Sequence, residues 1–129
     1  MMSRFAPWFL LLTGLVFAGI GLMGLYDPTG TVAPMGLTLA DLSSRSEMRA
    51  VYGGMNLVIG LYLIAAFRNS ARQMTALTIA ALIMGGLALG RLLSMAVEGV
   101  PSPLILGFLA VEVTGCVLAL LLRRNAAAA

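Results

Sequence analysis

The sequence predicts an all-α integral membrane protein, a bundle of four transmembrane helices whose N and C termini are both cytoplasmic. Three observations predict it: 60% of the 129 residues are hydrophobic, only 10% are charged, and the apolar residues fall into long runs. Soluble domains are about 45–50% apolar and about 25% charged. A chain this short cannot hide so many apolar side chains from water, so lipid is the expected solvent.

Each apolar run is long enough for one span, because a hydrocarbon core about 30 Å thick needs roughly 20 helical residues. The expected elements are four helices and one outer loop, at about residues 5–25, 45–67, 74–96, 103–122 and 26–44. The first run is longer than the roughly 7–15 apolar residues of a signal peptide and lacks a cleavage pattern, which favours a retained helix. The whole chain, 1–129, forms a single transmembrane domain with an unconstrained tail at 126–129.

Polar and helix-breaking residues separate these runs. A polar turn at 68–72 joins the second and third helices, and a Gly-Pro cluster at 98–103 separates the third from the fourth. The outer loop holds two segments with capping-box spacing, 38–41 and 44–47. The second predicts that the second helix begins at about Arg45. The first favours a short helical turn at the membrane surface.

The arginines predict the orientation. Net charge is +3, from eight arginines against five carboxylates. Of the arginines that set the topology, five lie on the side of the termini and two on the other side: Arg4, Arg68, Arg72, Arg123 and Arg124, against Arg45 and Arg49. The positive-inside rule then places both termini in the cytoplasm, which in a bacterium makes this an inner-membrane protein. Because the arginines punctuate apolar runs and do not cluster on a polar face, no nucleic-acid partner is expected.

The composition argues against most catalytic classes. The chain has no histidine, which excludes a His-ligated metal site and a His-based triad, and its single cysteine, Cys116, cannot form an intrachain disulfide. The sequence contains no nucleophile–base pair, no metal-ligand set and no phosphate-binding glycine loop. We therefore expect no enzyme activity, no catalytic residue, no metal and no cofactor.

Small residues predict how the helices pack, because helices in lipid associate by close contact and not by water exclusion. Three helices carry small residues at helical spacing: Gly14, Ala18 and Gly21; Gly86, Gly90 and Ser94; Gly107, Gly115 and Ala119. These faces favour a tight bundle surrounded by membrane lipid. The same faces could also serve a homo- or hetero-oligomer.

Two ionisable residues interrupt the apolar runs, Arg91 in the third and Glu112 in the fourth. An ionisable group inside a span costs roughly 2.5–3.5 kcal/mol on insertion scales, so each is a candidate functional residue. From the helical rise, Glu112 lies about 15 Å and Arg91 about 9 Å from the outer ends of their helices. The two helices are consecutive and antiparallel, so an Arg91–Glu112 pair is expected.

Further polar residues share faces of the second and third helices at spacings of three and four. We expect six residues to converge on a polar pocket in the outer half of the bundle: Arg49, Tyr52, Asn56, Arg91, Ser94 and Glu112. Two interpretations remain open. The pocket binds a ligand, or the buried charges only hold the helices together, since an unpaired charge in lipid is worse than a paired one.

Two stretches resemble a known family. Residues 49–56, RAVYGGMN, and 86–94, GLALGRLLS, followed by 98–101 and Glu112, resemble the bacterial membrane family called domain of unknown function 4345, and Asp27-Pro28 fits it too. The resemblance covers about residues 5 to 122. It implies that the six polar residues above belong to the family pattern. The family brings no established activity, so the resemblance strengthens the architecture more than the function.

Two functions therefore compete. The first is a binding or permease-like protein for a small amphipathic or anionic molecule or a lipid head group, with Arg49 and Arg91 holding the anionic part and Tyr52 and Asn56 donating hydrogen bonds. The second is an accessory or assembly subunit of a larger membrane complex, in which the Arg/Glu network is purely structural. The second predicts that Gly86 and Gly90 face outward, toward a partner.

Overall fold

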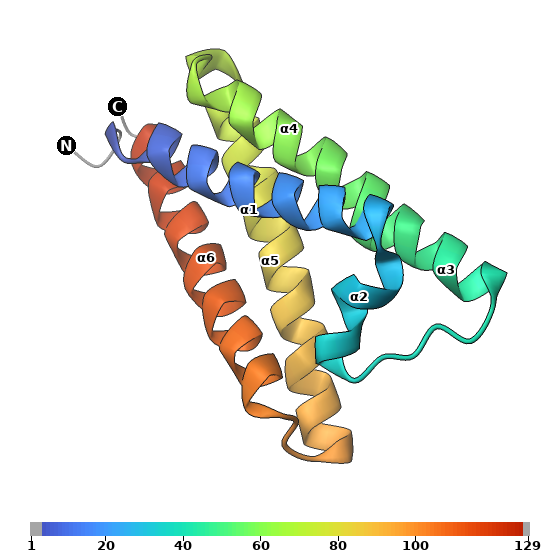
Figure 1. The fold of residues 1–129 in the computed structure, drawn as a ribbon. Coiled ribbons are helices and arrows are strands. Elements are labelled where there is room, and N and C mark those ends of the chain that lie inside the picture. Colours follow the sequence, from blue (N-terminus) through green and yellow to red (C-terminus); the bar gives the residue numbers. More distant parts are fainter. Residues whose placement is uncertain (1–3, 128–129) are drawn as a thin grey trace.

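The computed structural model describes residues 4–127, and Figure 1 shows that they form helices, with an extended connection between the region of α2 (Pro28–Val32) and α3 (Leu42–Met48). Four helical segments are long and apolar enough to cross a membrane. They are α1 (Ala6–Tyr26), a composite of α3 (Leu42–Met48), η3 (Arg49–Met55) and α4 (Asn56–Phe67), then α5 (Ser70–Glu98) and α6 (Pro103–Ala127). The all-α class and the four membrane-length helices predicted from the sequence are confirmed.

The third and fourth helices extend beyond the apolar runs that predict them. α5 begins at Ser70 because the side chain of Asn69 accepts a hydrogen bond from the backbone N–H of Ala71, at 3.1 Å. It ends at Gly99, whose φ of 104° favours glycine. α6 is helical to Ala127, so the expected tail is helical as far as the structure describes it, and residues 128–129 lie outside the described part.

The second span starts earlier than predicted, because Asp41 and not Ser44 is its N-cap. The Asp41 carboxylate accepts from the backbone N–H of Ser44 at 2.7 Å, and the Ser44 hydroxyl accepts from the backbone N–H of Asp41 at 3.1 Å. A carboxylate caps a helix about as well as a hydroxyl does, and its negative charge is in addition favourable at the positive helix end. The hydrogen bonds from Ser44, that of its backbone first, hold the pKa of the Asp41 carboxyl below its usual range.

The short helix of the outer loop lies ahead of the segment predicted to form it. Residues 38–40 are not helical, whereas α2 (Pro28–Val32) and the 3₁₀ turn η2 (Ala33–Met35) form directly after α1. Asp27 begins α2 by accepting from the backbone N–H of Gly30 at 2.9 Å. The short helix α2 is therefore started by Asp27 as its N-cap and Pro28 at its first helical position.

Glycines bring α1 and the second span into backbone contact. A Cβ added to Gly14 would lie 2.8 Å from the carbonyl oxygen of Gly60, and one added to Gly24 would lie 2.8 Å from the backbone nitrogen of Gly53. Glycines at these positions on α1 are buried, as the sequence predicts for Gly14 and Gly21. Side chains of ordinary size would clash there, so these glycines set how closely the two helices approach.

The four helices share a core only in the half of the molecule near the chain ends. That core joins the start of α1, the ends of α4 and α6, and the start of α5, and it includes Leu10, Leu63, Leu77 and Leu122. Along α5, the last buried residue is Ala88, ten residues before the helix ends at Glu98. Figure 1 shows the consequence: the α1/α4 pair and the α5/α6 pair diverge toward their other ends, and α2 lies between them.

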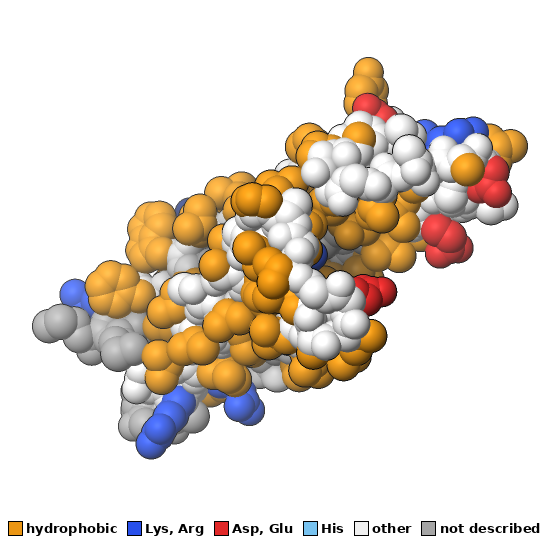
Figure 2. Space-filling view, turned by 90° about the horizontal axis from the view of Figure 1, so that it is seen from below, with side chains coloured by type: hydrophobic (Ala, Val, Ile, Leu, Met, Phe, Trp, Pro, Cys, Tyr) orange, Lys and Arg blue, Asp and Glu red, His pale blue; other side chains and the backbone are white. Residues whose placement is uncertain are grey.

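The surface has the distribution expected of a chain that sits in a bilayer. Figure 2 shows a broad apolar surface with charged side chains toward the two ends of the molecule, and carboxylates at the end opposite to that where α6 finishes. Large apolar side chains are exposed on all four spans, for example Trp8, Val58, Leu82 and Val111. Exposed apolar surface on this scale suits lipid contact and would be costly in water.

The contact between the glycines predicts different effects on stability for the same Gly→Ala substitution at two positions of α1. Gly14→Ala should destabilise the protein by about 1–3 kcal/mol, because its Cβ meets the backbone of Gly60 and Ile64. Gly19→Ala, which has no atom within 4 Å of the new Cβ, should leave stability unchanged or slightly raised. Thermal unfolding of both variants in the same detergent measures the difference. Equal melting temperatures would mean that α1 and α4 are not held at this distance.

Candidate functional site

Arg91 on α5 and Glu112 on α6 form the ion pair that the sequence predicts. The Arg91 Nε donates to both carboxylate oxygens, at 2.8 Å to Oε2 and 3.0 Å to Oε1. The side chain of Glu112 is 9% exposed and that of Arg91 is 22% exposed. Apolar surroundings screen such a pair far less than water does, so each charge depends on the other to remain in the helix bundle.

The ring of Phe108 completes the surroundings of the guanidinium. Its centroid lies 5.4 Å from the Arg91 Cζ. Phe108 precedes Glu112 by four residues, about one helical turn, so both side chains leave α6 on the same face. A cation over an aromatic face gains about 0.5–2 kcal/mol. Phe108 was not predicted from the sequence, although an aromatic residue one turn before an intramembrane carboxylate was the available signal.

The two terminal NH₂ groups of Arg91 take no part in the hydrogen bonds to Glu112. Within residues 4–127 they donate no hydrogen bond, because both bonds of the ion pair come from Nε. No buried side-chain nitrogen or oxygen of the described residues lacks a partner, so these two nitrogens reach the molecular surface. A guanidinium fork with free N–H groups binds carboxylates and phosphates bidentately.

Arg49, the second arginine of the predicted pocket, serves a different role. Its Nε donates to the backbone carbonyl of Leu25 at 3.2 Å. Leu25 lies in the last turn of α1, where carbonyls have no partner within the helix. Arg49 therefore satisfies the C-terminal end of α1 and ties it to the second span.

Tyr52 and Asn56 lie in and directly after the wide π-type turn η3. The Asn56 side-chain amide donates to the carbonyls of Val51 at 3.2 Å and Tyr52 at 3.1 Å, both in its own helix. Wide turns of this kind are rare and need such extra support. The backbone of Tyr52 packs against Gly24 of α1, and its side chain is half-buried.

Ser94, the sixth predicted residue, lies one turn outward of Arg91 on α5. Its hydroxyl donates to the Glu98 carboxylate at 2.7 Å, and both residues are exposed. The six residues are thus not gathered at one polar pocket. Arg91 and Glu112 meet, while Arg49 and Asn56 are bonded to backbone carbonyls of the first two spans. The reason is the divergence of the helix pairs, which takes the outer half of the second span away from α5.

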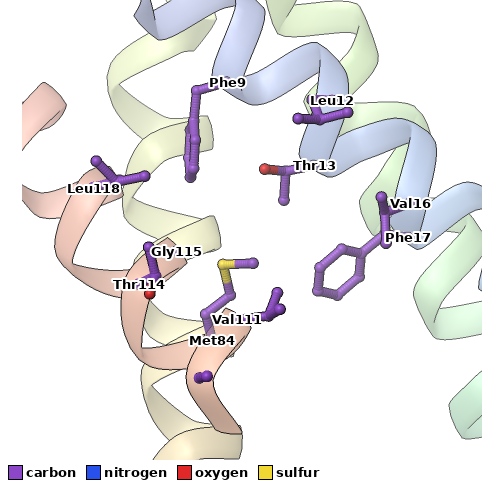
Figure 3. Close-up of a pocket in the computed structure, with 11 residues that line it drawn as sticks. Phe9, Leu12, Thr13, Val16, Phe17, Met84, Val111, Thr114, Gly115 and Leu118 are labelled. Atoms are coloured by element: carbon purple, nitrogen blue, oxygen red, sulfur yellow. The ribbon is translucent and has the colours of Figure 1, made fainter. Parts of the chain in front are cut away.

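A groove between α1 and α6 is a cavity of the described residues, and it is apolar. It has a volume of about 420 Å³ and is open on one side. One face of α1 from Phe9 to Phe17, Met84 of α5, and one face of α6 from Ala110 to Leu118 line it. Figure 3 shows the side chains of α1 and α6 facing each other across this space, with Met84 between them. None of the six predicted residues lines it.

The fold and the ion pair define a class before any comparison is made. Four apolar helices of membrane length suggest a multi-pass membrane protein, here with one buried ion pair between the third and fourth helices. The chain belongs to the family described as domain of unknown function (DUF4345), whose model matches residues 5–123. The resemblance seen in the sequence is therefore confirmed. Comparison with curated proteins gave no match, and neither did comparison with solved structures.

The ion pair predicts strong coupling between two leucine substitutions. Arg91→Leu or Glu112→Leu alone leaves a partner charge unpaired in an apolar setting, which costs about 3–5 kcal/mol. The double variant removes both charges, so it should unfold closer to the wild type than either single variant does. Thermal or denaturant unfolding of the four proteins gives the coupling energy. Additive effects would show that the two side chains act independently.

Proposed function

We propose that this chain is a binding protein of the bacterial inner membrane that holds the polar head of a small amphipathic molecule at Arg91. The observation that carries the proposal is the pair of surface-reaching terminal NH₂ groups of Arg91, which no described residue uses. A guanidinium that served only to join α5 to α6 would gain by turning its bidentate edge to Glu112. Because only Nε bonds to Glu112, both terminal NH₂ groups of Arg91 remain available to a ligand.

The surroundings favour binding over catalysis or passage through the bundle. Arg91 is steadied by Glu112 and Phe108, which keeps its fork in one orientation. The shared core of all four helices closes the bundle on the side of the chain ends. A molecule would therefore reach Arg91 from the diverging ends of the helices. A permease-like role would require the shared core to open. The proposal assigns the chain no catalytic step and no cofactor.

Arg91→Lys separates this role from a structural one. A lysine can still pair with Glu112 as a point charge, but it lacks the planar fork. The variant should keep its melting temperature within a few degrees and lose most of the amphipathic anion that co-purifies with the wild type, as measured by lipid extraction and mass spectrometry. Equal amounts of the same molecule on both proteins would refute the role of the fork. A severe loss of stability together with no co-purifying molecule on the wild type would favour a structural pair.

The orientation is part of the proposal. Arg68 directly follows α4, Arg72 lies in the first turn of α5, and Arg4, Arg123 and Arg124 lie near the chain ends, all on the side that the positive-inside rule assigns to the cytoplasm. Asp41, Glu47 and Glu98 lie on the other side.

Labelling with a membrane-impermeant thiol reagent in intact cells tests this orientation. After Cys116→Ser removes the natural thiol, a cysteine at Ser102 should react and one at Ser70 should not. Ser70 is the first residue of α5, Ser102 lies in the connection between α5 and α6 at the opposite end of that helix, and both are exposed. Reaction at Ser70→Cys and not at Ser102→Cys would invert the topology.

A second candidate, an accessory subunit of a larger complex, is favoured by the outward face of α5. Gly86 and Gly90 are exposed, and a Cβ added to either would meet no atom within 4 Å. Small residues at this spacing let a helix of another chain approach closely. The prediction that Gly86 and Gly90 pack against other helices within the bundle is therefore wrong.

Substitution on this face tests the second candidate. Gly86→Leu and Gly90→Leu should abolish any complex seen by cross-linking in native membranes, whereas Gly19→Leu, also open and exposed on α1, should not. A wild-type protein that runs as a monomer in membranes at every expression level would eliminate this candidate.

A further inference from the structure

The apolar groove between α1 and α6 has the size of a ligand site. Its volume of about 420 Å³ falls within the roughly 300–1,000 Å³ of small-molecule pockets. Its walls on both helices span eight residue steps, from Phe9 to Phe17 and from Ala110 to Leu118, or about 12 Å along the axis. Two threonines, Thr13 and Thr114, are the polar residues among those that line it.

Arg91 does not line this groove, but it lies beyond the outer end of the groove in the helical register of α5. On α5, Met84, Ala88 and Arg91 follow one another at spacings of four and three, so Arg91 continues the stripe on which Met84 forms the groove floor. On α6, the groove residue Val111 stands between Phe108 and Glu112, the two residues that hold the guanidinium. Along α5, Arg91 therefore lies seven residues, about two helical turns, beyond Met84, and on α6 Phe108 lies just beyond the groove wall that starts at Ala110.

We infer that the groove holds the hydrocarbon chain of a single-chain fatty acid whose carboxylate is bound by the terminal NH₂ groups of Arg91. The inference rests on the proposed function, and it adds the chemical class of the ligand. The groove supplies an apolar channel of limited length, and the arginine supplies a charged end. The carboxylate would then lie at Arg91, and the hydrocarbon would run toward the N- and C-terminal ends of the protein. This is the direction of a lipid of the outer leaflet, but with its head group deeper in the membrane.

Charge and shape favour one carboxylate on one chain. Glu112 already offsets most of the Arg91 charge, so a ligand with one negative charge is repelled less by the Glu112 carboxylate than a phosphate dianion is. The planar fork matches the two oxygens of a carboxylate. A groove walled by one face each of α1 and α6 accommodates a single chain, and a two-chain lipid would leave its second chain outside.

Photo-cross-linking tests the groove directly. The full chain in an uncharged detergent receives palmitate that carries a photoactivatable diazirine in mid-chain, and the labelled peptides are identified by mass spectrometry. Labels should appear on α1 between Phe9 and Phe17 and on α6 between Ala110 and Leu118. Val111→Trp, which fills the groove, should reduce labelling about tenfold, equivalent to about 1.4 kcal/mol. The matched control Val113→Trp, on an exposed face of α6 outside the groove, should not.

A second readout distinguishes failure of the groove from failure of the head site. Palmitate with a ¹³C-labelled carboxyl should show a bound NMR signal that disappears in Arg91→Lys. A bound signal that depends on Arg91, combined with labels scattered over all lipid-facing helices and unaffected by Val111→Trp, would overturn the groove and leave the proposed function standing. Loss of both readouts in the wild type would overturn both. Equal groove labelling by the methyl ester of the probe would show that the carboxylate is not recognised.

Discussion

Backbone contact between α1 and the second span is the interaction on which the rest of the structure depends. Helices separated by ordinary side chains lie about 8–10 Å apart, whereas Gly14 and Gly60 leave no room for a single added Cβ. These two helices therefore behave as one rigid pair, further tied by Arg49 to the end of α1. α5 and α6 meet this pair only in the half that contains the shared core. The divergence that follows keeps Arg91 accessible and leaves the groove beside α1 open.

The proposed binding role of Arg91 does not compete with its structural role for the same atoms. Nε alone joins α5 to α6 through the Glu112 carboxylate, and the terminal nitrogens are not needed for that bond. One guanidinium has five N–H donors, which is enough for both tasks. Glu112 has no such surplus, because it is almost fully enclosed and both of its oxygens accept from Arg91. The carboxylate is thus the structural half of the pair, and the arginine is the half that faces outward.

Much of this arrangement could be predicted from the sequence because lipid imposes simple rules. Apolar length fixes the number of helices, and an arginine and a glutamate on consecutive antiparallel spans have to meet. The fate of Arg49 and Asn56 could not be predicted in this way. Their spacing showed that they share a face of the helix, but not that their side chains donate hydrogen bonds to the backbone carbonyls of Leu25 and Val51. The groove gave no sequence signal, because its apolar lining looks like any lipid-facing surface.

The short connection between α5 and α6 has a consequence for how the protein enters the bilayer. Arg91 and Glu112 are 21 residues apart and belong to the same helical hairpin. Either helix moving into hydrocarbon by itself would carry an isolated charge, which costs several kcal/mol. The two helices together carry the charges as a pair, which costs less than either charge alone. The hairpin is therefore the piece of the C-terminal half that enters hydrocarbon at a lower cost than its separate helices.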